Sequence, residues 1–149
     1  MPLKLHEGAL VSLDEQDPTA TIVSLEEWLS GTAANATGVR LAPEDDVRQL
    51  ADKLSQLNTV EVSYPVYTDG RGHSQARMLR DQLSFDGEIR AVGDVRPDQI
   101  QMMIRCGIDV FEFDDPKAEK ATINSPDRYL GRYSNSYQSG YTTLQAGAN

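Results

Sequence analysis

The chain has 149 residues, of which 39% are hydrophobic and 25% are charged, and its formal net charge is -9. A chain of this length and composition can form one soluble domain with its own core. The acidic balance argues against nucleic acid or an anionic membrane as a partner. No apolar run approaches the length of a membrane span, and the first residues lack the features of a signal peptide, so we expect a cytoplasmic protein.

The supply of metal-binding and redox side chains is small. The chain has a single cysteine, Cys106, and two histidines, His6 and His73. One thiol cannot form an internal disulfide, a CxxC pair or the ligand set of an iron–sulfur cluster, and these residues supply a zinc site poorly. We therefore expect no metal site and no bound cofactor, so any redox role would depend on a partner. Cys106 precedes Gly107 at the end of a predicted helix, where a buried structural thiol is favoured over a reactive one.

Strand and helix patterns alternate from residue 21 onward. Residues 21–25, TIVSL, form a β-branched run, and Ser24 and Glu27 have the capping-box spacing that opens a short helix. Residues 38–43, GVRLAP, are the second strand candidate. The segment after it has the i, i+3, i+4, i+7 pattern of an amphipathic α-helix, with apolar positions at Val47, Leu50, Ala51, Leu54 and Leu57. Its first turn is expected to hold three acidic residues, Glu44, Asp45 and Asp46, which favour a helix N-terminus.

The second half of the chain continues this alternation. A strand is predicted at 60–65 and a helix at 74–83, then a strand at 88–92 and a helix at about 97–106, and finally a strand at 109–113. Pro97 suits the first helical position and Gly107 a C-terminal stop.

These patterns predict an α/β fold of five βα-type units around a mainly parallel sheet, either an open sheet or a partial barrel. Five units are too few for a complete eight-unit barrel. We expect one domain over residues 1–124, including a poorly ordered N-terminal arm or short hairpin, and a tyrosine-rich tail over residues 125–149. Exposed sheet edges are usually covered or paired, so we also expect a homodimer, with the tail as a candidate clamp.

Several segments resemble a bacterial family of unknown function. Its members are usually described as oxidoreductases linked to sulfite reduction, because their genes lie beside that of sulfite reductase. The resemblance spans roughly residues 20–114 and rests on VSLEEWL, GVRLAPEDD, DGRGHSQARMLRDQL, GEIRAVGDVRPDQI and RCGIDVFEF. It implies a role in assimilatory sulfur metabolism. At the position of His73, where the family tends to have an aromatic residue, this chain has histidine.

The candidate ligand-binding residues follow the predicted strands, at the edge where the carboxyl ends of parallel strands meet. They are Arg40, Asp69, Gly70, Arg71, Gly72, Ser74, Arg77 and Asp94. In one interpretation, Ser74 caps the following helix, the two glycines allow close backbone approach, and the two arginines at 71 and 77 bind an oxyanion such as sulfite. In the other, Asp-Gly-Arg-Gly is a turn, and Arg71 pairs with Asp69 or Asp94 to hold loops together.

Asp94 and Glu112 end neighbouring predicted strands. Two carboxylates so placed can act as a general acid/base pair or hold a magnesium ion, or they can cap helices and pair with Arg40 and Arg71. Three functions from different classes remain open. The chain is an accessory protein acting through contacts with sulfite reductase or its electron-donor component, a small oxyanion-handling enzyme that uses Arg71, Asp94 and Asp69, or a module that binds a sulfur metabolite.

Overall fold

The computed structural model describes residues 2–13 and 21–124. The predicted tail at 125–149 lies outside the described residues. The strands are β1 (Leu3–His6), β2 (Ala9–Ser12), β3 (Ile22–Ser24), β4 (Gly38–Leu41), β5 (Thr59–Tyr64), β6 (Glu88–Gly93) and β7 (Val110–Phe111). The helices are α1 (Leu25–Ser30), η1 (Val47–Gln56), α2 (Arg71–Asp81), η2 (Pro97–Gln99), α3 (Ile100–Arg105) and α4 (Pro116–Asn124). None of the helices in the described ranges is long and apolar enough to cross a membrane.

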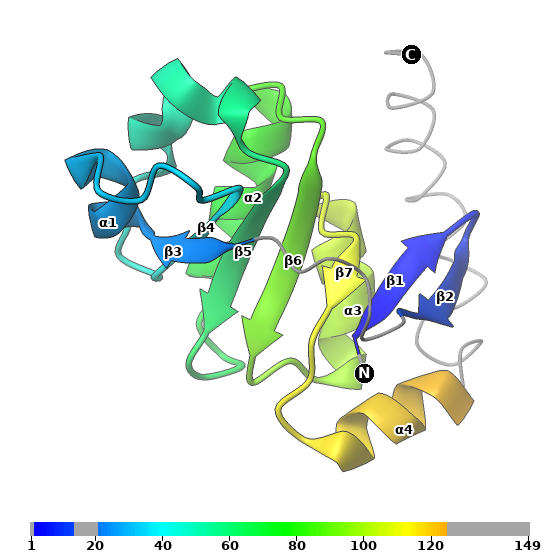
Figure 1. Ribbon diagram of the computed structural model, residues 1–149. Coiled ribbons are helices and arrows are strands. Elements are labelled where there is room, and N and C mark those ends of the chain that lie inside the picture. Colours follow the sequence, from blue (N-terminus) through cyan, green and yellow to red (C-terminus); the bar gives the residue numbers. More distant parts are fainter. Residues whose placement is uncertain (1, 14–20, 125–149) are drawn as a thin grey trace.

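The strands form one seven-stranded open sheet in the order β2-β1-β7-β6-β5-β4-β3 (Figure 1). All four pairings from β3 to β7 are parallel, which confirms the predicted α/β sheet and its five strands. The N-terminal arm forms an antiparallel β1–β2 hairpin, the second of the two expected forms, and β1 extends the sheet by pairing antiparallel with β7.

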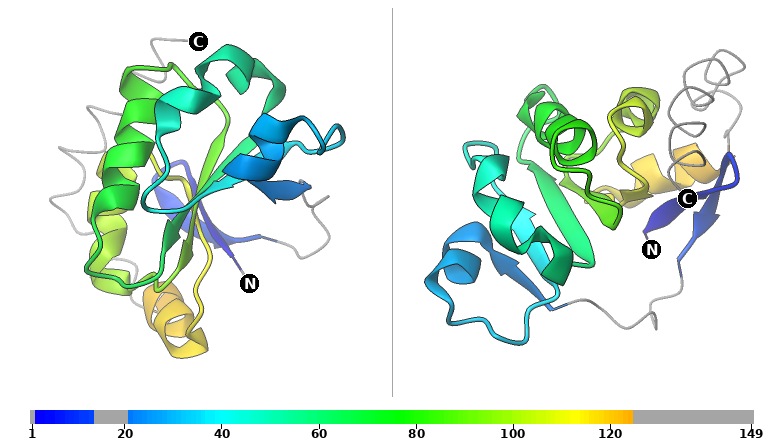
Figure 2. Two further views of the ribbon diagram at one scale, coloured as in Figure 1. Left: turned by 90° about the vertical axis from the view of Figure 1, so that its left-hand side faces the viewer. Right: turned by 90° about the horizontal axis from the view of Figure 1, so that it is seen from above.

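Each parallel strand lies beside the next one in sequence. Because βα crossovers are right-handed, a sheet that always grows in one direction collects its connecting helices on one face. Figure 2 shows α2 and α3 side by side on the same face of the sheet. Because β3 to β7 are parallel, their carboxyl ends and the turns that follow them lie along one edge of the sheet. We call this edge, at the carboxyl ends of β3 to β7, the carboxyl edge.

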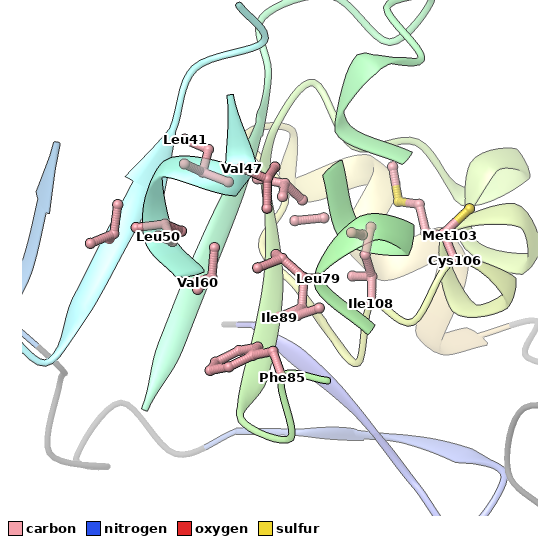
Figure 3. Close-up of a cluster of buried hydrophobic side chains, with 14 of the residues drawn as sticks. Leu41, Val47, Leu50, Val60, Leu79, Phe85, Ile89, Met103, Cys106 and Ile108 are labelled. Atoms are coloured by element: carbon pink, nitrogen blue, oxygen red, sulfur yellow. The ribbon is translucent and has the colours of Figure 1, made fainter. Parts of the chain in front are cut away.

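The core lies between the sheet and the helices that cover this face (Figure 3). β5 is buried on both faces and contributes Val60, Val62 and Tyr64 to the core, all fully inaccessible. From the helices come Leu50, Leu79 and Ile100, which are also fully inaccessible, and the thiol of Cys106, which is buried as predicted.

The segment predicted as an amphipathic α-helix is instead the 3-10 helix η1, with a non-helical residue at Lys53. Its buried residues are compatible with this form. Val47 and Leu50 are three residues apart, and so are Leu54 and Leu57, which is the spacing of a 3-10 turn. The kink at Lys53 lies between the two pairs, and both pairs are buried. Ala51, which an α-helix would bury, is exposed.

The expected acidic first turn is also wrong, because the acidic residues precede the helix. Asp46 is the N-cap of η1 and accepts a hydrogen bond from the backbone N–H of Arg48. The capping box of Ser24 and Glu27 is confirmed at α1. Pro97 opens η2 as predicted, and α3 follows directly from it.

Arg80, near the end of α2, fastens the opposite edge of the sheet. Its side chain is 6% exposed. Nε and Nη2 donate to the carbonyl of Gly107 at 3.1 and 2.9 Å, while Nη1 donates to those of Phe85 at 2.8 Å and Gly87 at 2.7 Å. Asp109 lies 3.6 Å from Nη2. A single guanidinium thereby ties α2 to the turns that lead into β6 and β7.

Replacing this arginine should weaken the whole domain. Arg80→Met removes all four donated hydrogen bonds and leaves buried carbonyls and Asp109 without their partner, so we expect a loss of about 3 kcal/mol or more in the free energy of unfolding. Arg77→Met, three residues earlier and 59% exposed, is the matched control and should cost no more than about 0.5 kcal/mol. Urea denaturation measures both. Equal effects of the two substitutions would contradict the role of Arg80.

Asp109 gives the fold a pH dependence. Burial raises the pKa of its carboxyl group from 3.8 to about 6, against the opposing effect of Arg80 and the N–H of Ile89. The folded state therefore binds a proton more tightly than the unfolded state, and its stability falls as the pH rises from about 4 through about 6. We expect Asp109→Asn to flatten this fall. Urea denaturation of both proteins across that range tests it, and parallel curves would show that Asp109 is not responsible.

Candidate functional site

Three βα turns at the carboxyl edge contain the same Asp-x-Arg arrangement, in which the arginine returns to the aspartate two residues before it. The pairs are Asp46–Arg48, Asp69–Arg71 and Asp94–Arg96. They follow β4, β5 and β6, respectively, and each leads into a helix. The side-chain hydrogen bond from the arginine is the main cause that lowers the pKa of each carboxyl group. These acids therefore stay ionised as fixed charges.

The Asp69–Arg71 pair lies in the DGRGHS loop. Asp69 accepts hydrogen bonds from Nε of Arg71 at 3.0 Å and from Nη2 at 2.7 Å, and its Oδ1 also accepts the backbone N–H of Arg71 at 3.1 Å. Arg71 lowers the pKa of Asp69 to about 2. Of the two partners considered for Arg71, the structure has Asp69 and not Asp94. The carboxylate of Asp69 thus occupies the place at the helix start where an external oxyanion would bind.

α2 begins at Arg71, three residues earlier than predicted, and this changes the roles of its neighbours. Ser74 is exposed within the first turn and does not cap the helix, whose N-cap is Gly70. Arg77 points away from the loop, with Nη1 donating to the carbonyl of Arg105 at 3.2 Å and Nε 3.4 Å from Asp81. The expected convergence of Arg77 with Arg71 is therefore wrong.

Gly72 serves packing. A Cβ at this position would lie 2.6 Å from Cζ of Tyr64, so only glycine lets α2 rest on the Tyr64 ring. The hydroxyl of Tyr64 lies 2.8 Å from Nδ1 of His73, and the two rings meet edge to face. Burial lowers the pKa of His73 and raises that of Tyr64. The pair is a neutral contact that fixes α2 on β5.

Asp94 links two turns of the carboxyl edge. It accepts Nε of Arg96 at 3.1 Å and the backbone N–H of Tyr67 at 3.1 Å. The guanidinium carbon of Arg96 lies 3.6 Å from the centre of the Tyr67 ring, a cation–π contact. Gly93 makes the turn possible, since it has φ +102° and any Cβ there would collide with the carbonyl of Tyr64. The loop after β5 is thereby held against the turn after β6.

Glu112 does not join Asp94. Its carboxylate lies 3.8 Å from Nη1 of Arg90, on the neighbouring strand, so neither acid has the arginine partner expected for it. Within the described ranges no three His, Cys, Asp or Glu side chains are grouped so that they could hold a metal ion.

Arg40 stands apart from the Asp-x-Arg pairs. Its Nη2 donates to both carboxylate oxygens of Glu61, at 3.0 and 3.1 Å, across the register pair of β4 and β5. The Glu61 side chain is 4% exposed and that of Arg40 is 57% exposed. A buried carboxylate therefore holds an accessible guanidinium.

Arg40 lines a pocket of about 510 Å³ at the carboxyl ends of β3, β4 and β5, which we call the β3–β5 pocket. Its lining residues are Ile22, Val23, Ser24, Glu27, Arg40, Ala42, Pro43, Glu44, Asp45, Ser63 and Pro65. Gln75 on α2 is 95% buried. Its Nε2 donates to the carbonyls of Ala42 at 2.8 Å and Asp45 at 3.1 Å, and it thereby supports the loop after β4 that lines the pocket. Of the predicted site residues, the pocket therefore includes only Arg40.

Residues 38–146 match the model of a family described as "Bacterial protein of unknown function (DUF934)". The match covers most of the chain. The protein belongs to the DUF934 family. No curated protein matches the chain.

In this DUF934 chain, sequence reasoning missed the Asp-x-Arg repeat and, apart from Arg40, the residues that line the pocket. The repeat has a signal that sequence reasoning could use, since the aspartates at 46, 69 and 94 recur at similar intervals after successive strands. The pocket has none, because Ser24, Glu44 and Ser63 come together only through the order and register of β3, β4 and β5.

Oxyanion binding at the DGRGHS loop stays a prediction, and the structure sharpens it. Because Asp69 fills the helix start, Asp69→Asn should enhance stabilisation by sulfite, and a double variant that adds Arg71→Ala should lose it. Thermal melting with sulfite, and with chloride at matched ionic strength, measures the response. If Asp69→Asn responds alike to both anions, the loop is a turn and no anion site.

Proposed function

We propose that this chain is an accessory protein of assimilatory sulfite reduction that acts through contacts with sulfite reductase or with its electron-donor component. The sulfur context derives from the resemblance of residues 20–114, and the family description names no reaction. The observation that supports a contact function is an exposed, rigidly held surface at the carboxyl edge. We call it the β5 loop surface and define it as residues 65–69 with Arg71, Asp94 and Arg96.

The centre of the β5 loop surface is apolar. Pro65 and Val66 are exposed, Val66 at 52%, and the polar Thr68 is exposed beside them. Tyr67 lies beside them with Arg96 stacked on its ring. Protein interfaces combine an apolar and aromatic centre with a polar rim, and their strongest contacts are enriched in tyrosine and arginine.

Ion pairs form the rim of this surface and hold it in place. The carboxylates of Asp69 and Asp94 fix the side chains of Arg71 and Arg96, and Asp94 also binds the loop through the N–H of Tyr67. A surface fixed before binding loses little conformational entropy when a partner docks. The geometry therefore suits recognition of a protein.

The enzyme alternative is favoured less by the same contacts. A general acid or base needs a pKa near the working pH. The arginine partners lower the pKa of both Asp69 and Asp94, the acids that this alternative would use.

A homodimer stays a prediction for this accessory protein. The outer strands of the sheet are β2 and β3, and both are short. Short edge strands discourage indefinite edge-to-edge pairing, yet they leave room for a closed contact with a second copy.

Binding to purified sulfite reductase and, separately, to its electron-donor component tests the proposal. We expect Val66→Asp to weaken binding by at least about tenfold, since a charge in the apolar centre of an interface must be desolvated without a partner. Leu29→Asp is the matched control, because Leu29 is a similarly exposed aliphatic residue on α1, at 49%, outside this surface. Biolayer interferometry with thermal melting of each variant separates lost contact from lost folding. The proposal fails if neither component binds the parent chain, or if both variants weaken binding equally.

A further inference from the structure

The β3–β5 pocket meets the β5 loop surface at Pro65, but its charged side chains lie outside that surface and give it a chemistry of its own. It lies between the carboxyl ends of three parallel strands, and its volume of about 510 Å³ is within the range of pockets that bind small molecules. Its apolar lining residues are Ile22, Val23, Pro43 and Pro65. The remaining lining is polar and contains charges of both signs.

The positive charge is Arg40, and it is held ready for a ligand. Its contacts with described residues pass through Nη2, which binds both oxygens of Glu61. Nε and Nη1 thus keep N–H donors on a side chain that is 57% exposed. These N–H groups can each donate a charge-assisted hydrogen bond to a carboxylate oxygen. The hydroxyls of Ser24 and Ser63 line the same pocket.

The negative charges are Glu27, Glu44 and Asp45. Two of them are fixed by backbone donors, Glu27 by the N–H of Ser24 at 3.2 Å and Asp45 by that of Ala42 at 2.7 Å. Glu44 is exposed. Within the part of the chain that the structure describes, no hydrogen bond or ion pair engages its carboxylate, although it interacts electrostatically with Arg71 on the next turn. It is therefore available to an ammonium group.

The balance of these charges decides the class of ligand. A small inorganic anion would be attracted by Arg40 alone and repelled by the three carboxylates of the pocket. Glu61 already partly neutralises Arg40. A simple amine would leave the donors of Arg40 unused. A molecule with a carboxylate and an ammonium group satisfies both kinds of charge, and its side chain can contact the apolar lining residues. We propose that the β3–β5 pocket binds a free α-amino acid, with its carboxylate on Arg40 and its ammonium group near Glu44.

Calorimetric titration of the full chain with each of the twenty standard amino acids, at up to about 10 mM, tests the proposal. We expect saturable binding of at least one of them. For that amino acid, the decarboxylated amine and the deaminated acid should each bind at least about tenfold more weakly, because each lacks one of the two charged contacts. Sulfite and sulfate serve as inorganic anion controls and should not compete.

Two variants assign the contacts. Glu44→Gln removes an exposed charge and should weaken binding at least about tenfold without lowering the melting temperature. Arg40→Gln combined with Glu61→Gln removes the guanidinium without leaving a buried unpaired carboxylate, and it should abolish binding. Arg48→Gln is the control, since Arg48 is a 71% exposed member of an ion pair outside the pocket. The proposal is overturned if no amino acid binds, if the amine or the acid alone binds equally well, or if the double variant retains binding. None of these outcomes bears on docking at Val66.

Discussion

The fold depends most on the buried guanidinium of Arg80. Parallel strands that follow one another along a sheet need long connections, and each connection must bring the chain back to the same starting edge. Arg80 meets that need by donating to three carbonyls, those of Phe85, Gly87 and Gly107, on the turns before β6 and β7. Because the starting points of these strands are fixed, their carboxyl ends emerge at fixed positions on the opposite edge.

The two edges of the sheet are therefore built differently. At the edge where the parallel strands begin, the buried side chain of Arg80 donates hydrogen bonds to backbone carbonyls. On the carboxyl edge, exposed arginines pair with carboxylates on their own turns, and Arg40 pairs with a carboxylate of the neighbouring strand. This difference places accessible side chains and the β3–β5 pocket at one edge and leaves the other edge to stability. The sequential strand order extends the carboxyl edge over several turns, in contrast to sheets whose strand order reverses at one crevice.

The five parallel strands were predictable because each is a short apolar and β-branched run between turn signals, and the capping box at Ser24 because its partner Glu27 is local. Errors arose where two local patterns fit the same residues. The spacing of Val47, Leu50, Leu54 and Leu57 suits either an α-helix or two 3-10 turns with a kink between them. The structure has the 3-10 form with the kink. Likewise, Ser74 resembles an N-cap, but Asp69 already binds the first helical amide.

Side-chain contacts to backbone carbonyls could not be predicted from the sequence, because every residue carries the same carbonyl group. Arg80 and Gln75 read as ordinary polar helix residues, yet each supports a turn distant in sequence. The pairing of Arg40 with Glu61 requires the register of β4 and β5, which no local pattern specifies. The Asp-x-Arg turns differ in this respect, because each carries its counter-ion two residues away. The two charges of each pair are therefore balanced within the turn itself. A surface assembled from such self-neutralising pairs can gain or lose a whole pair, through insertion or deletion, without a change in the net charge of the edge.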